Sequence, residues 1–120
     1  MNPYIDGTNF GSITIAGKKM NHDVLIRLDG KIKKRKKKLS KKIYGTSHTI
    51  SLEEAQYVFE EGAETLILGS GQFGMVHLSD QAAEFFSEAG CQIEIYPTPE
   101  AIKYWNKITA KAIGLFHITC

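Results

Sequence analysis

The stretch SLEEAQYVFEEGAETLILGS, residues 51–70, decides the fold. It begins with Ser51 and Glu54, the hydroxyl and carboxyl of a capping box, which satisfies backbone amides at the start of a helix. It ends in the apolar run 65–68, which is typical of a strand whose two faces are both covered by helices. The stretch therefore predicts a helix followed by a buried, central strand.

The same unit repeats twice toward the C-terminus. Ser79 starts a second helix, and residues 91–96 alternate as a half-covered strand does. Thr98 and Pro99 open a third helix, with a capping hydroxyl and a proline where no amide hydrogen is needed. With the apolar run 113–118, residues 51–118 form an αβαβαβ pattern, which favours a parallel sheet with right-handed crossovers.

Toward the N-terminus, alternation with a period of about two is typical of strands. Ile13 and Ile15 alternate with smaller residues up to a break at Gly17, and residues 24–28 alternate up to the hairpin-turn pair Asp29-Gly30. Antiparallel hairpins are therefore expected here. The returning strand is expected to run through Lys33 to Lys38 as a sheet edge that projects into water, followed by a loop at residues 40–49.

Composition limits the class of protein. The 120 residues suit a single domain, residues 1–120, and 42% of them are hydrophobic, as in an ordinary globular protein. Neither a membrane span nor a secretion signal is visible. The two cysteines, Cys91 and Cys120, are expected to be thiols, so we expect a cytoplasmic protein with no membrane association.

Charge is distributed unevenly. The net charge is +2, but residues 31–42 hold nine of the fifteen basic residues and no acid, which leaves six basic against thirteen acidic residues elsewhere. Weak, non-specific nucleic-acid binding is one interpretation of this basic patch, although no aromatic residue lies within it for base stacking. A solvated edge, favoured here, and a docking strip for another copy in a homo-oligomer are the alternatives. The patch comprises Lys33, Lys34, Arg35, Lys36, Lys37, Lys38, Lys41 and Lys42.

Four short motifs carry a family resemblance: residues 44–48 (YGTSH), 68–71 (LGSG), 101–106 and the ending HITC at 117–120. Together they resemble the small domain shared by the adipogenesis-associated protein of animals, a mitochondrial complex I assembly factor and many uncharacterised archaeal and bacterial proteins. The resemblance implies an α/β three-layer sandwich with a mixed central sheet. It implies no reaction, and it leaves assembly-factor-like interaction as an analogy only.

Ligands of open α/β sheets bind outside the carboxyl ends of the parallel strands, where residues 69–71 should lie with exposed backbone amides. If the loop at residues 44–48 covers the same edge, its hydroxyls and imidazole surround a small cleft suited to a small anion. The equally weighted alternative is that His48 and its neighbours only satisfy loop backbone. The candidate ligand-binding residues are Tyr44, Thr46, Ser47, His48, Gly69, Ser70, Gly71 and His117.

Other chemistry is less well supported. Residues 69–74 match G-x-G-x-x-G, but the next helix begins five residues after Gly74, so the glycines are interpreted as turn formers and no cofactor is expected. His117 and Cys120 lack the partners of a metal site, and no metal is expected. The sequence thus predicts an accessory or small-ligand-binding domain without an assignable reaction. The alternatives are an electrostatic binding module that holds nucleic acid or an acidic protein through Lys31–Lys42, and an assembly-factor-like interaction protein.

Overall fold

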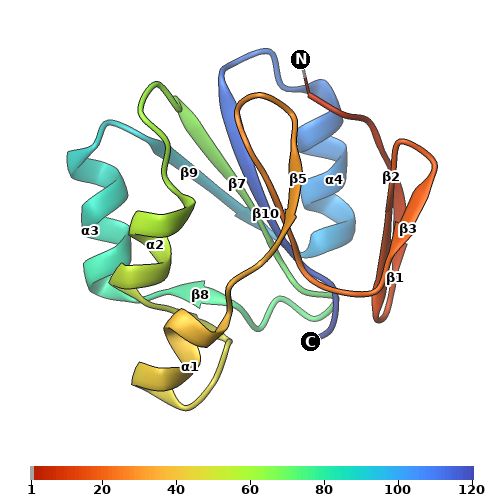
Figure 1. The fold of residues 1–120 in the computed structure, drawn as a ribbon. Helices are drawn as coiled ribbons and strands as arrows, with labels where there is room; N and C mark the ends of the chain where they lie inside the picture. Colours follow the sequence, from red (N-terminus) through yellow and green to blue (C-terminus); the bar gives the residue numbers. More distant parts are fainter. Residues whose placement is uncertain (1) are drawn as a thin grey trace.

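A five-stranded mixed sheet runs through the middle of the molecule in the order β5-β4-β10-β7-β9 (Figure 1). The computed structural model describes residues 2–120. β9, β7 and β10 are parallel, whereas β4 and β5 are added antiparallel. The strands are β4 (Val24–Ile26), β5 (Ile32–Lys34), β7 (Thr65–Ser70), β9 (Gln92–Tyr96) and β10 (Ala112–His117).

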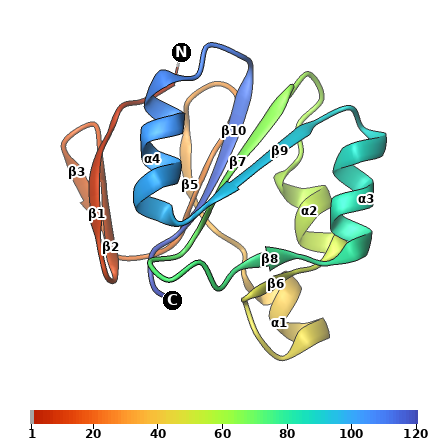
Figure 2. The same ribbon diagram turned by 180° about the vertical axis from the view of Figure 1, so that it is seen from behind.

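Each face of this sheet carries its own core. α2 (Leu52–Val58) and α3 (Asp80–Glu88) cover one face, where Leu66, Leu68 and Phe86 are buried. α4 (Thr98–Lys107) covers the other face, where Trp105 is buried. Both views of the ribbon show the helices on opposite sides of the strands (Figures 1 and 2). The three-layer α/β sandwich and the αβαβαβ order of residues 51–118 are therefore confirmed.

A three-stranded antiparallel sheet packs beside α4 on the same face. Its strands are β1 (Ile5–Asn9), β2 (Ser12–Ile15) and β3 (Lys18–Met20), in the order β1-β2-β3. Ile13 and Ile15 are buried in the core beneath α4, which explains the period of two. The hairpins before residue 35 are confirmed, and Gly30 has the positive φ that the Asp29-Gly30 turn requires.

The predicted strand through Lys33 to Lys38 is wrong beyond Lys34. β5 ends there, Arg35 turns inward, and α1 (Lys38–Tyr44) begins within the expected strand and occupies much of the expected loop. Lysine and leucine are good helix formers, so the segment folds as a helix once it leaves the sheet. After α1, β6 (Thr49–Ile50) pairs in parallel with β8 (His77–Leu78), which ties this segment to the residues after β7.

Of the two expected helix caps, one is half formed and the other is absent. The Ser51 hydroxyl accepts from the amide of Glu54, as in a capping box, but the Glu54 carboxylate does not return to the Ser51 amide. The Thr98 hydroxyl makes no cap, and Pro97 takes the N-cap position of α4. The Glu54 carboxylate instead bonds to Arg35 and Ser40, and the Thr98 hydroxyl donates to the His117 carbonyl.

Within residues 2–120 the longest helix is α4, with ten residues, and none has the length and hydropathy needed to cross a bilayer.

Candidate functional site

The parallel strands β7 and β10 end side by side at one rim of the sheet. Ser70 and His117 are neighbours in register, so both side chains point toward the face that carries α2 and α3. His48 reaches the same rim, since its ring lies edge-on to that of His117 with 5.5 Å between the centroids. The backbone oxygen of His48 also accepts from His77. The histidine-bearing segment and the turn after β7 therefore lie together, which is the condition on which the expected cleft depends.

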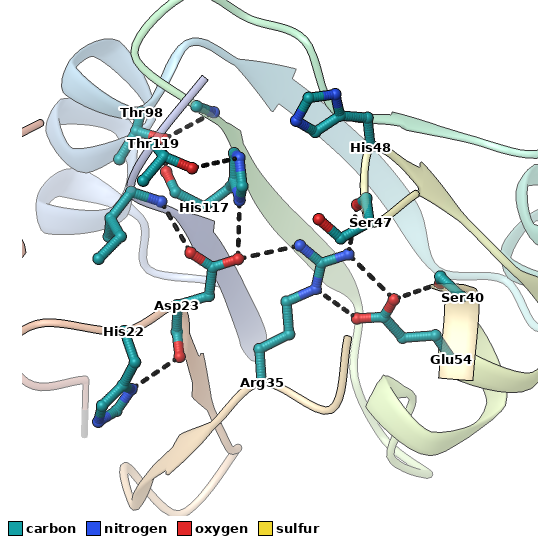
Figure 3. A network of polar contacts seen from close by, with 12 residues as sticks. His22, Asp23, Arg35, Ser40, Ser47, His48, Glu54, Thr98, His117 and Thr119 are labelled. Carbon is teal, nitrogen blue, oxygen red and sulfur yellow. Dashed lines mark hydrogen bonds and ion pairs between the residues drawn. The ribbon is translucent and has the colours of Figure 1, made fainter. Parts of the chain in front are cut away.

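A chain of three polar side chains crosses this rim (Figure 3). His117 Nδ1 lies 2.7 Å from Asp23 Oδ2, and His117 Nε2 lies 3.1 Å from the Thr119 hydroxyl. A carboxylate only accepts hydrogen bonds, so Nδ1 carries the hydrogen. In the neutral ring Nε2 is then an acceptor, and the Thr119 hydroxyl donates to it. Asp23 thus fixes the tautomer and the orientation of His117.

Behind Asp23 lies a buried cluster of charged groups centred on Arg35. The Arg35 guanidinium donates to Asp23 Oδ2 at 3.0 Å, to both oxygens of Glu54 at 2.7 and 3.1 Å, and to the Ser47 carbonyl at 2.8 Å. Ser40 donates to Glu54 from α1. The side chains of Arg35 and Glu54 are 1% and 0% exposed. The cluster joins α1, α2, the residue after β5 and the residue before β4 beneath the rim.

The cluster favours charged forms despite its burial. Burial alone raises the pKa of Asp23, but the hydrogen bond and charge of His117, the Ile118 amide and Arg35 together hold that pKa below its ordinary value. Burial lowers the pKa of Arg35, yet Glu54 and Asp23 outweigh it and raise that pKa. Asp23 is therefore an ionised partner that holds a hydrogen on His117 Nδ1.

Two polar side chains at the rim have unused hydrogen-bonding capacity. Among residues 2–120, neither ring nitrogen of the half-buried His48 bonds to another side chain or to backbone. The hydroxyl of Ser70 likewise takes part in none of the hydrogen bonds within this part of the chain. Both groups neighbour the oriented His117, which in turn contacts the half-buried Thr119. Together the four side chains bring two imidazoles and two hydroxyls to one rim of the sheet.

The expectation of exposed amides at the glycine turn is wrong. The amide of Gly71 donates to the Thr98 hydroxyl, and those of residues 72, 73 and 75 donate to the backbone oxygens of Thr119 and Cys120. The amides of residues 74 and 76 also donate within the turn. Gly71 has φ of +104°, and a Cβ there would collide with the backbone of Cys120. The turn is filled by the chain itself, so side chains rather than amides must recognise any ligand.

The remaining candidate residues have other positions. Tyr44 ends α1, is 41% exposed, and lines a separate hollow with Thr49 and His77. The Thr46 hydroxyl accepts from the amide of His48, and Ser47 is buried with its carbonyl on Arg35. Gly69 allows close packing, because a Cβ there would crowd Phe116 and Thr98. The predicted set therefore separates into a rim group and supporting residues.

The basic patch contains one misassigned residue. Arg35 is 4% exposed and belongs to the buried cluster, whereas the seven lysines of the patch, and Lys31, are exposed. Sequence reasoning also missed Asp23 and Thr119, and interpreted Glu54 only as a helix cap. The signal that could have found Arg35 is its identity, since a single arginine among eight lysines suits planar, bidentate contact with carboxylates.

Solved structures of low and moderate similarity share this fold. The chain is 31% identical to a conserved hypothetical protein, PH1505, from Pyrococcus horikoshii, with a TM-score of 0.91 over 97% of this chain and 98% of that one. It is 30% identical to the structure named MT938, with a TM-score of 0.84 over 99% and 100% of the two chains. A Bordetella pertussis protein described as an Mth938-like domain is 12% identical, with a TM-score of 0.68 over 97% and 85%.

The family comparison covers nearly the whole fold. Residues 5–114 match the model described as a protein of unknown function (DUF498/DUF598). That range includes all four helices and every strand up to β10, but it stops at Gly114 within β10, before His117 and Thr119. Neither the description of the family nor that of the Pyrococcus relative assigns a reaction. The chain belongs to the DUF498/DUF598 family of unknown function.

Proposed function

We propose that this chain is a small-ligand-binding domain whose site is the rim formed by His48, Ser70, His117 and Thr119. The observation that carries the proposal is the Asp23–His117–Thr119 chain beside a second imidazole whose ring nitrogens have no protein partner among residues 2–120. An orienting carboxylate is unnecessary for a histidine that only packs. It is useful for a histidine that must present Nε2 to a partner.

A small anion is the ligand class that this arrangement favours. When His117 is protonated, Asp23 balances its charge from behind, while Nε2–H donates to the Thr119 hydroxyl and leaves the hydrogen of that hydroxyl free to donate outward. The hydroxyls of Ser70 and Thr119 can rotate to donate, and His48 adds a further donor. Carboxylates and phosphates accept several such bonds at once. Because the glycine-turn amides are occupied, selectivity would rest on these four side chains.

A thermal-shift screen of phosphorylated and carboxylated metabolites tests this proposal. A ligand present at about 100 times its Kd stabilises a folded protein by about 2.7 kcal/mol, which is readily measured. We expect a subset of small anions to raise Tm. His48→Ala and Ser70→Ala should each weaken that shift without altering the Tm of the free protein by more than a few degrees.

His77→Ala is the matched control, because it removes another surface imidazole that does not belong to the rim group. It should leave the ligand-induced shift intact. The proposal is overturned if no small anion raises Tm, or if the shift survives in both His48→Ala and Ser70→Ala.

A further inference from the structure

A second surface, around α1, combines dense positive charge with an exposed aromatic ring. Six lysines of this surface take part in no ion pair among the described residues, whereas Lys42 pairs with Glu53 at 2.7 Å. With Arg35 neutralised inside the molecule, these six carry the excess charge of the basic patch. They are Lys33, Lys34, Lys36, Lys37, Lys38 and Lys41, all exposed.

The helix places an aromatic ring at the end of this charged surface. Lys37, Lys41 and Tyr44 follow one another at spacings of four and three residues, so they lie along one stripe of α1. Tyr44 is 41% exposed and borders a hollow of about 510 Å³. The polar side chains of His77, Asp80 and Gln81 also line that hollow. No such ring was expected beside the lysines, because residues 31–42 contain none.

We propose that this surface binds single-stranded nucleic acid, with phosphates along the lysines and one unpaired base stacked on Tyr44. Lysines contribute the sequence-independent and salt-sensitive part of the binding. An exposed ring stacks on any base, but only where the base is free of a duplex. Asp80 disfavours a phosphate inside the hollow and can accept from the amino group of cytosine or the ring N–H of uracil, so the base is the part that enters.

Fluorescence anisotropy with a labelled oligouridine and oligocytidine of about 12 nucleotides tests the proposal. We expect binding that weakens steeply between about 50 and 200 mM salt. Tyr44→Ala should weaken binding about 5- to 150-fold, as expected for loss of one stacked base, while Tyr44→Phe retains most of the affinity. Lys37→Gln with Lys41→Gln should reduce the salt slope by about 1.4, or about 0.7 for each phosphate that is no longer neutralised.

The matched control is Lys103→Gln with Lys107→Gln, which removes the same charge at the same spacing from exposed positions of α4, on the other face of the central sheet. It should leave affinity and salt slope nearly unchanged. Circular dichroism of every variant verifies that the fold is retained. The proposal is overturned if no binding occurs at low salt, if Tyr44→Ala binds as the wild type does, or if duplex DNA and heparin bind as tightly as the single strands.

Discussion

Replacing Arg35 by methionine tests the buried cluster that supports the rim. The substitution keeps an unbranched side chain of similar length but removes the guanidinium. Four hydrogen bonds are removed: one to Asp23, two to Glu54 and one to the Ser47 carbonyl. Asp23 keeps His117 and the Ile118 amide as hydrogen-bond partners. Glu54, which is fully buried, keeps only Ser40. Glu54 therefore suffers the larger loss.

The expected effect is large for a protein of this size. Removing one partner of a buried ion pair costs about 3 to 5 kcal/mol, because the remaining charge stays buried without compensation. Domains of this kind have unfolding free energies of about 5 to 15 kcal/mol, so Arg35→Met should remove a large fraction of the stability. Adding Glu54→Leu to Arg35→Met should recover at least about 1 kcal/mol, since the orphaned carboxylate is removed.

Urea unfolding followed by circular dichroism measures these free energies. Lys34→Met is the control, since Lys34 is an exposed neighbour in the same basic segment, and it should change stability by less than about 0.5 kcal/mol. Equal stabilities for Arg35→Met and Lys34→Met would refute the reasoning. Arg35 would then be a solvated cation like the lysines around it.

Three further predictions concern the rim. In urea unfolding, Gly71→Ala should lower the free energy of unfolding more than Gly90→Ala does. Both glycines have positive φ, but only at Gly71 would a Cβ collide with other backbone. Equal losses would contradict this. Thr98→Val should lower the free energy of unfolding by about 1 to 3 kcal/mol, since the buried Thr98 hydroxyl joins the Gly71 amide to the His117 carbonyl. Thr98→Ser keeps the hydroxyl and should retain most of that stability. The lowered pKa of Asp23 adds stability that is present above its ordinary value of 3.8 and is lost as pH falls through the lower folded value. Acid titration of Asp23→Asn should therefore show a shallower loss of stability below about pH 4, and an unchanged slope would show that Asp23 is not held ionised.

The sequence was sufficient to predict the layers of the fold because the local patterns agree with the way the elements pack. The apolar run at residues 65–68 and the repeated helix starts predict parallel strands covered on both faces, and the alternation at Ile13 and Ile15 predicts hairpins. The lysine segment was mispredicted because its fate depends on Arg35. That side chain turns inward to two carboxylates that lie 12 and 19 residues away, and no local pattern reports such pairing.

The position of the candidate site was predictable, but its composition was not. Strand order brings Ser70 and His117 to one rim, so the αβαβαβ pattern is enough to predict that polar residues gather there. Asp23 meets His117 across 94 residues, which no spacing reveals. The glycine turn appeared open because its amides face the last residues of the chain, an arrangement that exists only once β10 lies beside β7.

The tautomer of His117 is the most direct test of the proposed site. Long-range nitrogen NMR spectra distinguish a ring that carries hydrogen on Nδ1 from one that carries it on Nε2. In the free protein we expect the neutral His117 ring to carry its hydrogen on Nδ1, and we expect Asp23→Asn to lose that preference. Adding a binding anion should change the chemical shifts of His117 Nε2 and of the His48 ring nitrogens. Hydrogen on Nε2, or an imidazole that is indifferent to Asp23, would contradict an oriented histidine at this rim.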